Sequence, residues 1–170
     1  MTFPVKIRFV VITLSDRASR GEYEDLSGPA IQRMIREFFE ARSIATEIEN
    51  VIIPDDPQRL SALLLKYRAQ GIEVVFTTGG TGLGPRDFTP DVVKPLLDKE
   101  IPGVMEMIRV KYGMIKPAAL VSRSIAGVTA KTLVYCLPGS VKAVGEYCQE
   151  ILPTIMHSMK MILGIDDHNC

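Results

Sequence analysis

The 170-residue sequence has no tryptophan, only three cysteines and no excess of either charge. The cysteine count is odd and no Cys-x-x-Cys pair occurs, so neither a disulfide framework nor a zinc site is indicated. Buried thiols in a reducing cytoplasm are the simpler expectation. Basic and acidic residues number 20 each, which argues against a nucleic-acid-binding protein, because such proteins carry a basic excess. We therefore expect locally placed charges to meet any anionic ligand.

Long hydrophobic runs are missing too. No apolar run reaches 18 residues, so no membrane span is expected, and residues 1–8 lack the apolar stretch of a signal peptide. Hydrophobic residues still make up 46% of the chain, a content that favours a buried subunit interface. The length predicts a single domain over residues 1–170, with a core at about 6–163 and a frayed polar tail after Gly164.

Apolar runs and helical stripes alternate along the chain. Strands are expected at residues 7–14, 45–53, 73–78, 118–125 and 132–137. Helices are expected to start at Ser27, before Leu60, at Thr89, at Pro102 and after Ser140. This order predicts an α/β fold: a three-layer α/β/α sandwich around a mostly parallel sheet. The short connection at 126–131 predicts one antiparallel edge strand.

The most informative segment is the glycine-rich stretch at residues 77–91, which follows a buried strand and closes on a helix start. Open α/β sheets bind phosphorylated ligands at such turns, because glycines let backbone amides approach an anion. Within it, Arg86 can hold a phosphate, and Asp87 can hold a metal ion that bridges phosphates.

Four loops should meet at the carboxyl edge of the predicted sheet, and three of them bring carboxylates. The loops are residues 15–17, 54–56, 77–87 and 137–140. Carboxylates beside anion-binding amides are electrostatically unfavourable unless a cation lies between them. Mg²⁺ prefers one or two carboxylates together with phosphate oxygens, so the pattern indicates a magnesium–nucleotide site.

Each of these features also has a structural explanation. The glycines alone could form a tight turn, and their spacing fits neither a P-loop nor the dinucleotide-binding fingerprint. Asp16 and Asp55 could be ordinary turn residues, and Arg86 could pair with a nearby acid. Residues 89–91 fit a helix cap, a first-turn proline and an acid matched to the helix dipole. Lys142, in contrast, opposes the dipole of the last helix, which slightly favours a role with an anion.

Taken together, six segments resemble the MogA/MoaB-type molybdopterin-binding family, which is related to the G domain of gephyrin. The resemblance covers about residues 6–163, and two of the motifs favour the MogA branch. The segments are residues 15–25, Ile53-Pro54-Asp55, 77–82, Arg86-Asp87-x-Thr89-Pro90, Ser122-Arg123 and 137–140.

The resemblance implies a molybdopterin adenylyltransferase, in which the phosphate of molybdopterin attacks the α-phosphorus of Mg-ATP. It also implies a homotrimer and, as a possible partner, a protein that inserts molybdenum. By the family's motif Asp55 and Asp87 are the essential carboxylates, both assigned to Mg²⁺. Backbone amides of Gly79, Gly80 and Gly82, with Thr81, are expected to cradle phosphate. The expected polar contacts to pterin or nucleotide are Ser15, Asp16, Ser27, Ser122 and Ser140, with Arg86 as a phosphate ligand.

Two other functions stay open. One is a trimeric pterin-binding or scaffold protein without turnover, of the MoaB or gephyrin type. The other is a different nucleotidyl or phosphoryl transferase that uses the same crevice. One residue departs from the family's pattern, because Val141 stands where a proline commonly follows the last motif. We expect this substitution to loosen the turn slightly and leave activity intact.

Overall fold

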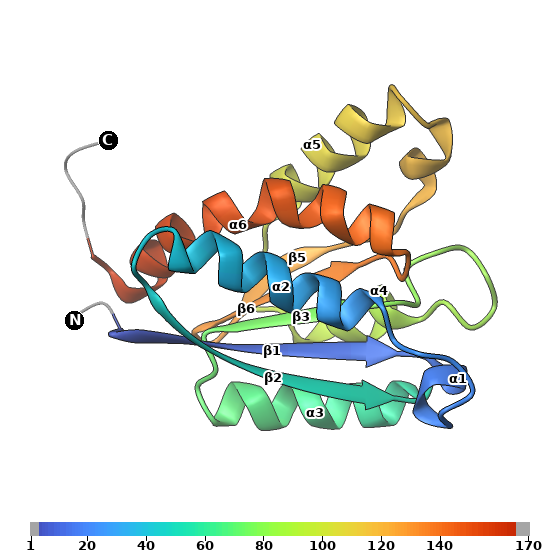
Figure 1. The fold of residues 1–170 in the computed structure, drawn as a ribbon, viewed down its shortest axis with the longest axis horizontal. Coiled ribbons are helices and arrows are strands. Elements are labelled where there is room, and N and C mark those ends of the chain that lie inside the picture. Colours follow the sequence, from blue (N-terminus) through green and yellow to red (C-terminus); the bar gives the residue numbers. More distant parts are fainter. Residues whose placement is uncertain (1–3, 166–170) are drawn as a thin grey trace.

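The computed structural model describes residues 4–165, so the expected polar tail lies almost entirely outside the described residues. Its centre is a six-stranded sheet of order β2-β1-β3-β6-β5-β4 (Figure 1). The strands are β1 (Lys6–Leu14), β2 (Ala45–Ile53), β3 (Val74–Thr78), β4 (Lys99–Glu100), β5 (Ala126–Thr129) and β6 (Thr132–Leu137). The pairs β1–β2, β1–β3 and β3–β6 are all parallel.

Helices cover both faces of the sheet, as Figure 1 shows for α2 and α6 on one side and α3 on the other. The helices are α1 (Asp16–Ser19), α2 (Ser27–Glu40), α3 (Pro57–Ala69), α4 (Thr89–Val93), α5 (Pro102–Gly113) and α6 (Val141–Leu163). Two 3-10 helices, η1 (Lys94–Leu96) and η2 (Pro117–Val121), follow α4 and α5. The three-layer, mostly parallel sandwich expected from the sequence is confirmed.

Strand β1 explains the two cores. Its side chains alternate between the faces, and six of its nine residues are apolar because both faces are covered. Phe9 and Val11 pack into the core beneath α2, α5 and α6. Val10 and Ile12 pack into the second core, beneath α3 and α4. The parallel strands are thereby fixed between two helical layers, with all their carboxyl ends at one edge.

The prediction of a strand at 118–125 is wrong. Residues 117–121 form η2, outside the sheet, and the strand lies instead at β5, in the segment expected to be a connection. Leu120 and Val121 gave this segment its strand-like pattern, but their side chains are 54% and 56% exposed. The antiparallel edge itself is confirmed: β5 runs antiparallel to β6, and the unexpected two-residue β4 pairs with β5 in turn.

The residues of the β5–β6 turn explain why the sequence did not place this hairpin correctly. Thr129 pairs with Thr132, so only Ala130 and Lys131 connect the strands. Ala130 has a φ of 52°, a left-handed conformation that two-residue hairpin turns normally give to Asn or Gly. Without either residue, the sequence does not mark the position of the turn within the short connection.

Two helix starts differ in detail from the expectation. Helix α2 begins at Ser27 as expected, but the carboxylate of Asp25, and not a serine, accepts the amide of Gly28 at 3.1 Å. Helix α4 begins at Thr89 without any side-chain cap, because its N-cap residue is Phe88, and the Thr89 hydroxyl donates to the carbonyl of Gly79. The short helix α1 was not expected at all.

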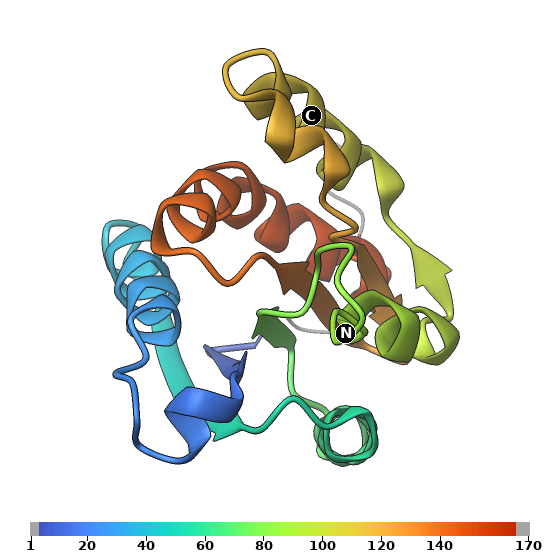
Figure 2. The same ribbon diagram turned by 90° about the vertical axis from the view of Figure 1, so that its right-hand side faces the viewer.

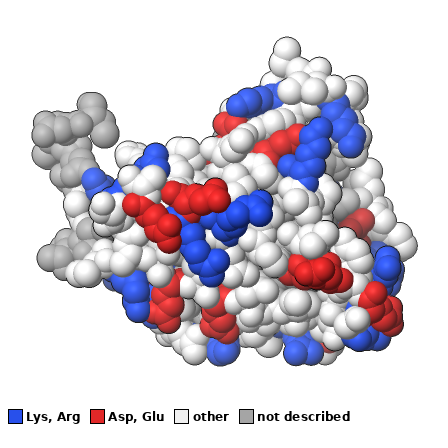
Figure 3. Space-filling model, viewed as in Figure 1, with Lys and Arg blue, Asp and Glu red and all other residues white. Residues whose placement is uncertain are grey.

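Basic and acidic side chains are interspersed on the face shown in Figure 3, without a broad region of one sign. Within the described residues, no helix is both long and apolar enough to cross a membrane.

Candidate functional site

The loops that follow β1, β2, β3 and β6 meet at the carboxyl edge of the sheet, which faces the viewer in Figure 2. Three cavities open there. The wide cavity, of about 730 Å³, lies between the glycine loop (residues 79–87), α5, η2 and the first turns of α6. The serine cavity, of about 450 Å³, lies between α1, the start of α2 and the start of α6. The loop cavity, of about 350 Å³, lies between the ends of β1 and β2 and the glycine loop.

Each pair of cavities shares a wall. Gly80 and Asp87 line both the wide and the loop cavity. The wide and serine cavities share Gly139 and Ser140, while the serine and loop cavities share Leu14 and Ser15. The three spaces therefore surround one small region, so ligands in different cavities can meet.

The glycine loop presents free amides to this region. Among the described residues, no atom accepts a hydrogen bond from the backbone N–H of Gly80, Thr81 or Gly82. Gly79 differs from the expectation, because its N–H donates to the carbonyl of Leu137 at 3.0 Å and is not available to a ligand. Three consecutive amides without an acceptor can bind an anion such as phosphate.

Two glycines in this loop are required by space as well as by backbone conformation. Gly79 and Gly80 have φ values of 106° and 65°. A Cβ on Gly79 would lie 2.6 Å from the Leu14 carbonyl oxygen, and one on Gly80 would lie 2.5 Å from the hydroxyl of Thr89. The turn is therefore packed directly onto β1 and α4.

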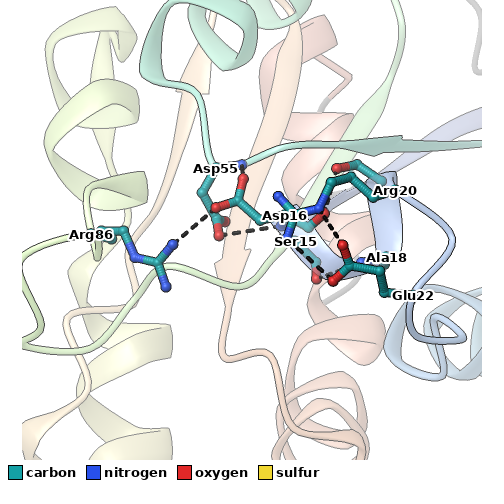
Figure 4. A network of polar contacts seen from close by, with 8 residues as sticks. Ser15, Asp16, Ala18, Arg20, Glu22, Asp55 and Arg86 are labelled. Carbon is teal, nitrogen blue, oxygen red and sulfur yellow. Dashed lines mark hydrogen bonds and ion pairs between the residues drawn. The ribbon is translucent and has the colours of Figure 1, made fainter.

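Asp55 and Asp16 hold each other's backbone across the ends of β2 and β1 (Figure 4). The amide of Asp55 donates to Oδ1 of Asp16 at 3.0 Å, and the amide of Asp16 lies 3.4 Å from Oδ2 of Asp55. Oδ2 of Asp16 accepts a hydrogen bond from Arg86 at 2.9 Å. Asp55 and Arg86 line the loop cavity, whereas Asp16 lines none of the three. Asp16 thus has a structural position, in which it joins the ends of β1 and β2. Arg86 pairs with this acid, as the structural explanation given above for Arg86 predicts.

Asp87 faces both the wide and the loop cavity. Its Oδ2 accepts the amide of Gly84 at 2.7 Å, which closes a tight turn within the loop. No described residue donates a hydrogen bond to its Oδ1. Asp87 therefore has one oxygen fixed by the protein and one open to a ligand.

The described residues contain no group of three or more His, Cys, Asp or Glu side chains that could hold a metal ion unaided. Asp55 and Asp87 nevertheless line the same loop cavity, together with Gly80, whose amide is free. Two carboxylates fit Mg²⁺ when phosphate oxygens complete its coordination shell. This donor set suits a magnesium ion that arrives with a polyphosphate.

The four candidate serines lie at the cavities, but their hydroxyls already have protein partners. Ser15 and Ser140 are the N-caps of α1 and α6 and accept amides at 3.1 and 3.3 Å. Ser27 donates to Asp25, and Ser122 accepts the hydroxyl of Tyr147 at 3.1 Å. A hydroxyl that accepts one bond can still serve a ligand through its second lone pair or its proton.

Arg123 was quoted in a motif but not assigned to the site, and the structure gives it a central position. Its backbone amide donates to the Thr81 carbonyl at 2.9 Å, and its Nε donates to the Gly82 carbonyl at 2.8 Å. Its other nitrogens bond the Asp87 carbonyl and both carboxylate oxygens of Asp91. The sequence contains both the arginine and the glycine loop, but it does not show that the two are in contact. Only the fold brings them together.

The far wall of the wide cavity was also missed. Tyr112 and Tyr147 line it, together with Lys116 and Lys142. Burial and the hydrogen bond to Glu150 raise the pKa of Tyr112 to about 12, so its phenol stays protonated at neutral pH. Lys142 stands at the cavity wall, which agrees with the anion role that its unfavourable helix position suggested. The cavity thus combines aromatic and apolar walls with two lysine ammonium groups, of which that of Lys142 lies 3.7 Å from the carboxylate of Glu146.

Comparisons with known proteins agree on one family. A family model described as "Probable molybdopterin binding domain" matches residues 10–157. Molybdopterin adenylyltransferase of Helicobacter pylori strain J99 is 36% identical over 159 residues, which cover 93% of this chain and 89% of the relative. Gephyrin of Dictyostelium discoideum is 37% identical, but the match covers 89% of this chain and only 22% of gephyrin.

A solved structure agrees as well. The molybdopterin biosynthesis enzyme MoaB of Thermus thermophilus superposes with a TM-score of 0.82 at 34% identity, over 93% of this chain and 97% of that one. Because the relatives are named both as MoaB and as adenylyltransferase, the preference for the MogA branch stays a prediction. The fold, the carboxyl-edge cavities and the near full-length matches together show that this chain belongs to the molybdopterin-binding family.

Proposed function

We propose that this protein is a molybdopterin adenylyltransferase, acting as one domain over residues 1–170. The observation that carries the proposal is the row of free amides at Gly80, Thr81 and Gly82 on the cavity wall that includes Asp87, with Asp55 in the loop cavity that Gly80 and Asp87 also line. Amides that bind an anion and carboxylates that bind a cation are compatible when the ligand is a magnesium polyphosphate. The 36% identity to a molybdopterin adenylyltransferase supports the same activity.

The reaction joins a phosphate monoester to a nucleotide. An oxygen of the molybdopterin phosphate forms a bond to the α-phosphorus of ATP, and the bond from that phosphorus to the bridging β-oxygen breaks. Pyrophosphate leaves with the electron pair, and adenylyl-molybdopterin is formed. A phosphate monoester is already an anionic nucleophile, so this reaction needs no strong general base.

The protein's contribution is then to align two anions and to reduce their repulsion. The free amides hold phosphate oxygens, while Asp55 and Asp87 would hold Mg²⁺, which supplies charge neutralisation of the polyphosphate when bound. Arg86 lines the loop cavity and can replace its ion pair with Asp16 by one with a phosphate. Lys142, at the start of α6, can likewise exchange its ion pair with Glu146 for a phosphate.

Adenine and pterin need separate binding surfaces for their flat rings. The wide and serine cavities provide two, on either side of the wall formed by Gly139 and Ser140. The loop cavity touches both of them and contains the carboxylates. We propose that the rings occupy the two larger cavities and that the phosphates lie in the region that all three cavities surround.

We further propose a homotrimer. Exposed apolar side chains gather on α5, on η2 and on the turn between them, among them Met114 at 85% and Ile115 at 77% exposure. Such a patch is unusual on a monomer and fits a contact with a second copy of the chain. A light-scattering mass of about three times 18.8 kDa would support the trimer, and a monomer mass would contradict it. The free, buried Cys136 and Cys148 fit a reducing compartment, for which we propose the cytoplasm.

The test is direct. Purified protein is incubated with molybdopterin, ATP and Mg²⁺, and the products are measured by mass spectrometry. We expect adenylyl-molybdopterin and one pyrophosphate per transfer, both dependent on Mg²⁺. Binding of molybdopterin without any adenylyl product would instead support the non-catalytic scaffold function, which the gephyrin relative makes the main alternative. AMP transfer to other phosphate monoesters would indicate a different nucleotidyltransferase.

A further inference from the structure

The three free amides of the glycine loop belong to peptide groups whose carbonyl oxygens all accept hydrogen bonds from other parts of the protein. The carbonyl of Gly79 accepts the hydroxyl of Thr89 at 2.9 Å. The carbonyl of Gly80 accepts the backbone amide of Thr89 at 3.0 Å, and the carbonyl of Thr81 accepts the amide of Arg123 at 2.9 Å. Each of these oxygens shares a peptide plane with the N–H of the next residue.

That sharing determines where the amides point. All peptide bonds of the described residues are trans, and in a planar trans peptide the C=O and the N–H point in opposite directions. Fixing the Gly79 carbonyl toward α4 therefore turns the Gly80 N–H away from α4. The same argument applies to the N–H groups of Thr81 and Gly82. All three residues line the wide cavity, where no described residue accepts a bond from these groups.

The second wall of the wide cavity repeats the arrangement. The hydroxyl of Thr78, the last residue of β3, donates to the carbonyl of Pro138 at 2.9 Å. The N–H of Gly139 shares that peptide and points the other way, and no described residue accepts a bond from it. Gly139 lines both the wide and the serine cavity.

Thr78 and Thr89 share further properties. Both residues are completely buried, and each hydroxyl donates its proton to a backbone carbonyl, so neither donates to a ligand, although Thr78 borders the serine cavity. A valine of the same shape would fill the space but would leave a backbone carbonyl without its donor. Neither threonine is needed as a helix cap, since Thr78 ends a strand and α4 has no side-chain cap.

We propose that Thr78 and Thr89 are positioning residues whose buried hydroxyls aim the amides of Gly139 and Gly80 at the phosphates of the substrates. Thr89 sets the glycine loop and Thr78 sets the turn before α6. This inference rests on the proposed function only for the identity of the phosphates, because the amides would bind any phosphate anion placed there.

The test uses pyrophosphate, a product of the proposed reaction, as the probe in the presence of Mg²⁺. Variants Thr89→Val and Thr78→Val are titrated by calorimetry and by amide NMR of ¹⁵N-labelled protein. Because one charge-assisted hydrogen bond is misaligned, we expect each variant to bind pyrophosphate about tenfold more weakly. Thr89→Ser and Thr78→Ser keep the hydroxyl and should bind like the unmodified protein.

The NMR titration separates aiming from general loosening. In the unmodified protein the amide signals of Gly80 and Gly139 should both shift on addition of pyrophosphate. In Thr89→Val the Gly80 shift should be lost while the Gly139 shift remains, and in Thr78→Val the pattern should be reversed. The matched control is Thr154→Val in α6, which removes a hydroxyl bond to a backbone carbonyl, that of Ile151 at 2.7 Å, at a residue that lines none of the cavities.

Unchanged affinity in both valine variants, or an equal loss in Thr154→Val, would overturn the proposal. If Thr89→Val does not fold, the Thr78→Val arm decides by the same criteria. The proposed function fails separately: unmodified protein that binds pyrophosphate but forms no adenylyl-molybdopterin would refute the activity and leave the aiming result valid.

Discussion

At the scale of single residues, the site depends on which polar atoms the fold leaves without a partner. Asp87 has one carboxylate oxygen bonded to the Gly84 amide and one open to the cavities. Asp55 lines the same loop cavity as Asp87 and follows the end of β2. Both are assigned to the magnesium polyphosphate, so their charge should matter more than their shape.

We therefore expect Asp87→Asn and Asp55→Asn to reduce the rate of adenylyl transfer at least about 100-fold, through loss of about 3 kcal/mol of electrostatic stabilisation. The rate is measured by pyrophosphate release. Asp56→Asn is the matched control, because Asp56 only caps α3 through the amides of Gln58 and Arg59, which asparagine can also do. Full activity in Asp87→Asn or Asp55→Asn would refute the assignment of that residue.

The sequence predicts which loops meet at the carboxyl edge, because each of them follows a strand, but it does not predict the contacts that the fold adds. Glycines and aspartates after apolar strands mark the carboxyl edge, because parallel strands must end together there. Nothing in the sequence indicates that the Gly79 amide donates to the carbonyl of Leu137, or that Arg123 donates to the carbonyl of Gly82. Those contacts join segments far apart in the chain, so no local pattern contains them.

At the scale of elements, the hairpin between β5 and β6 contains a correctable strain. Ala130 holds a φ of 52°, which costs an L-residue with a Cβ roughly 1 kcal/mol. Asparagine tolerates this conformation better, so Ala130→Asn should raise the free energy of unfolding by about 0.5–1 kcal/mol.

Urea denaturation measures this change. The matched control is Ala62→Gly, at an exposed position inside α3, which should lower stability by about 1 kcal/mol because glycine disfavours a helix interior. A loss of stability in Ala130→Asn would mean that the left-handed turn residue is not strained.

The start of α6 provides a second prediction at this scale. Val141 is the first residue of the helix, after the Ser140 cap, and no described residue accepts its amide. Proline at this position loses no hydrogen bond and reduces the freedom of the unfolded chain. Val141→Pro should therefore increase stability by about 0.5 kcal/mol in the same assay. A decrease would show that the helix start needs a backbone φ that proline cannot adopt.

Elements were predictable from the sequence where their pattern is long and both ends are marked. The strand β1 and the helices α2 and α6 have such patterns. The segment 118–125 has the apolar residues of a strand, but Pro117 starts a 3-10 helix there and the side chains face outward. Strand β4 has only two residues and exists because β5 offers it an edge. Tertiary context, not local propensity, determines both.

At the scale of the whole molecule, two buried thiols report on cooperative unfolding. Burial raises the pKa of Cys136 and of Cys148 to about 12, so at about pH 8 each thiol is protonated and shielded from solvent. Only the thiolate reacts with disulfide reagents, and it forms here only when the core opens. Cys136 lies in the core under α3, and Cys148 lies in the core under α2 and α6. The two thiols therefore report on the opening of both helical layers.

In a Cys170→Ser variant, we expect no rapid thiol release with a disulfide reagent at about pH 8 and release from both thiols after addition of denaturant. The labelling rate should follow global unfolding at both positions. Fast labelling of one thiol under native conditions would show that one helical layer opens independently of the other.

The shared walls between the three cavities constrain how this site can change over evolutionary time. A substitution at Gly80, Asp87, Gly139 or Ser140 alters two cavities at once, so it cannot adapt the site to one ligand without affecting the other. Residues that line a single cavity, such as Tyr23 in the serine cavity or Ile115 in the wide cavity, carry no such constraint. New substrate preferences in this lineage should therefore arise first at these outer positions, while the residues between the cavities stay as they are.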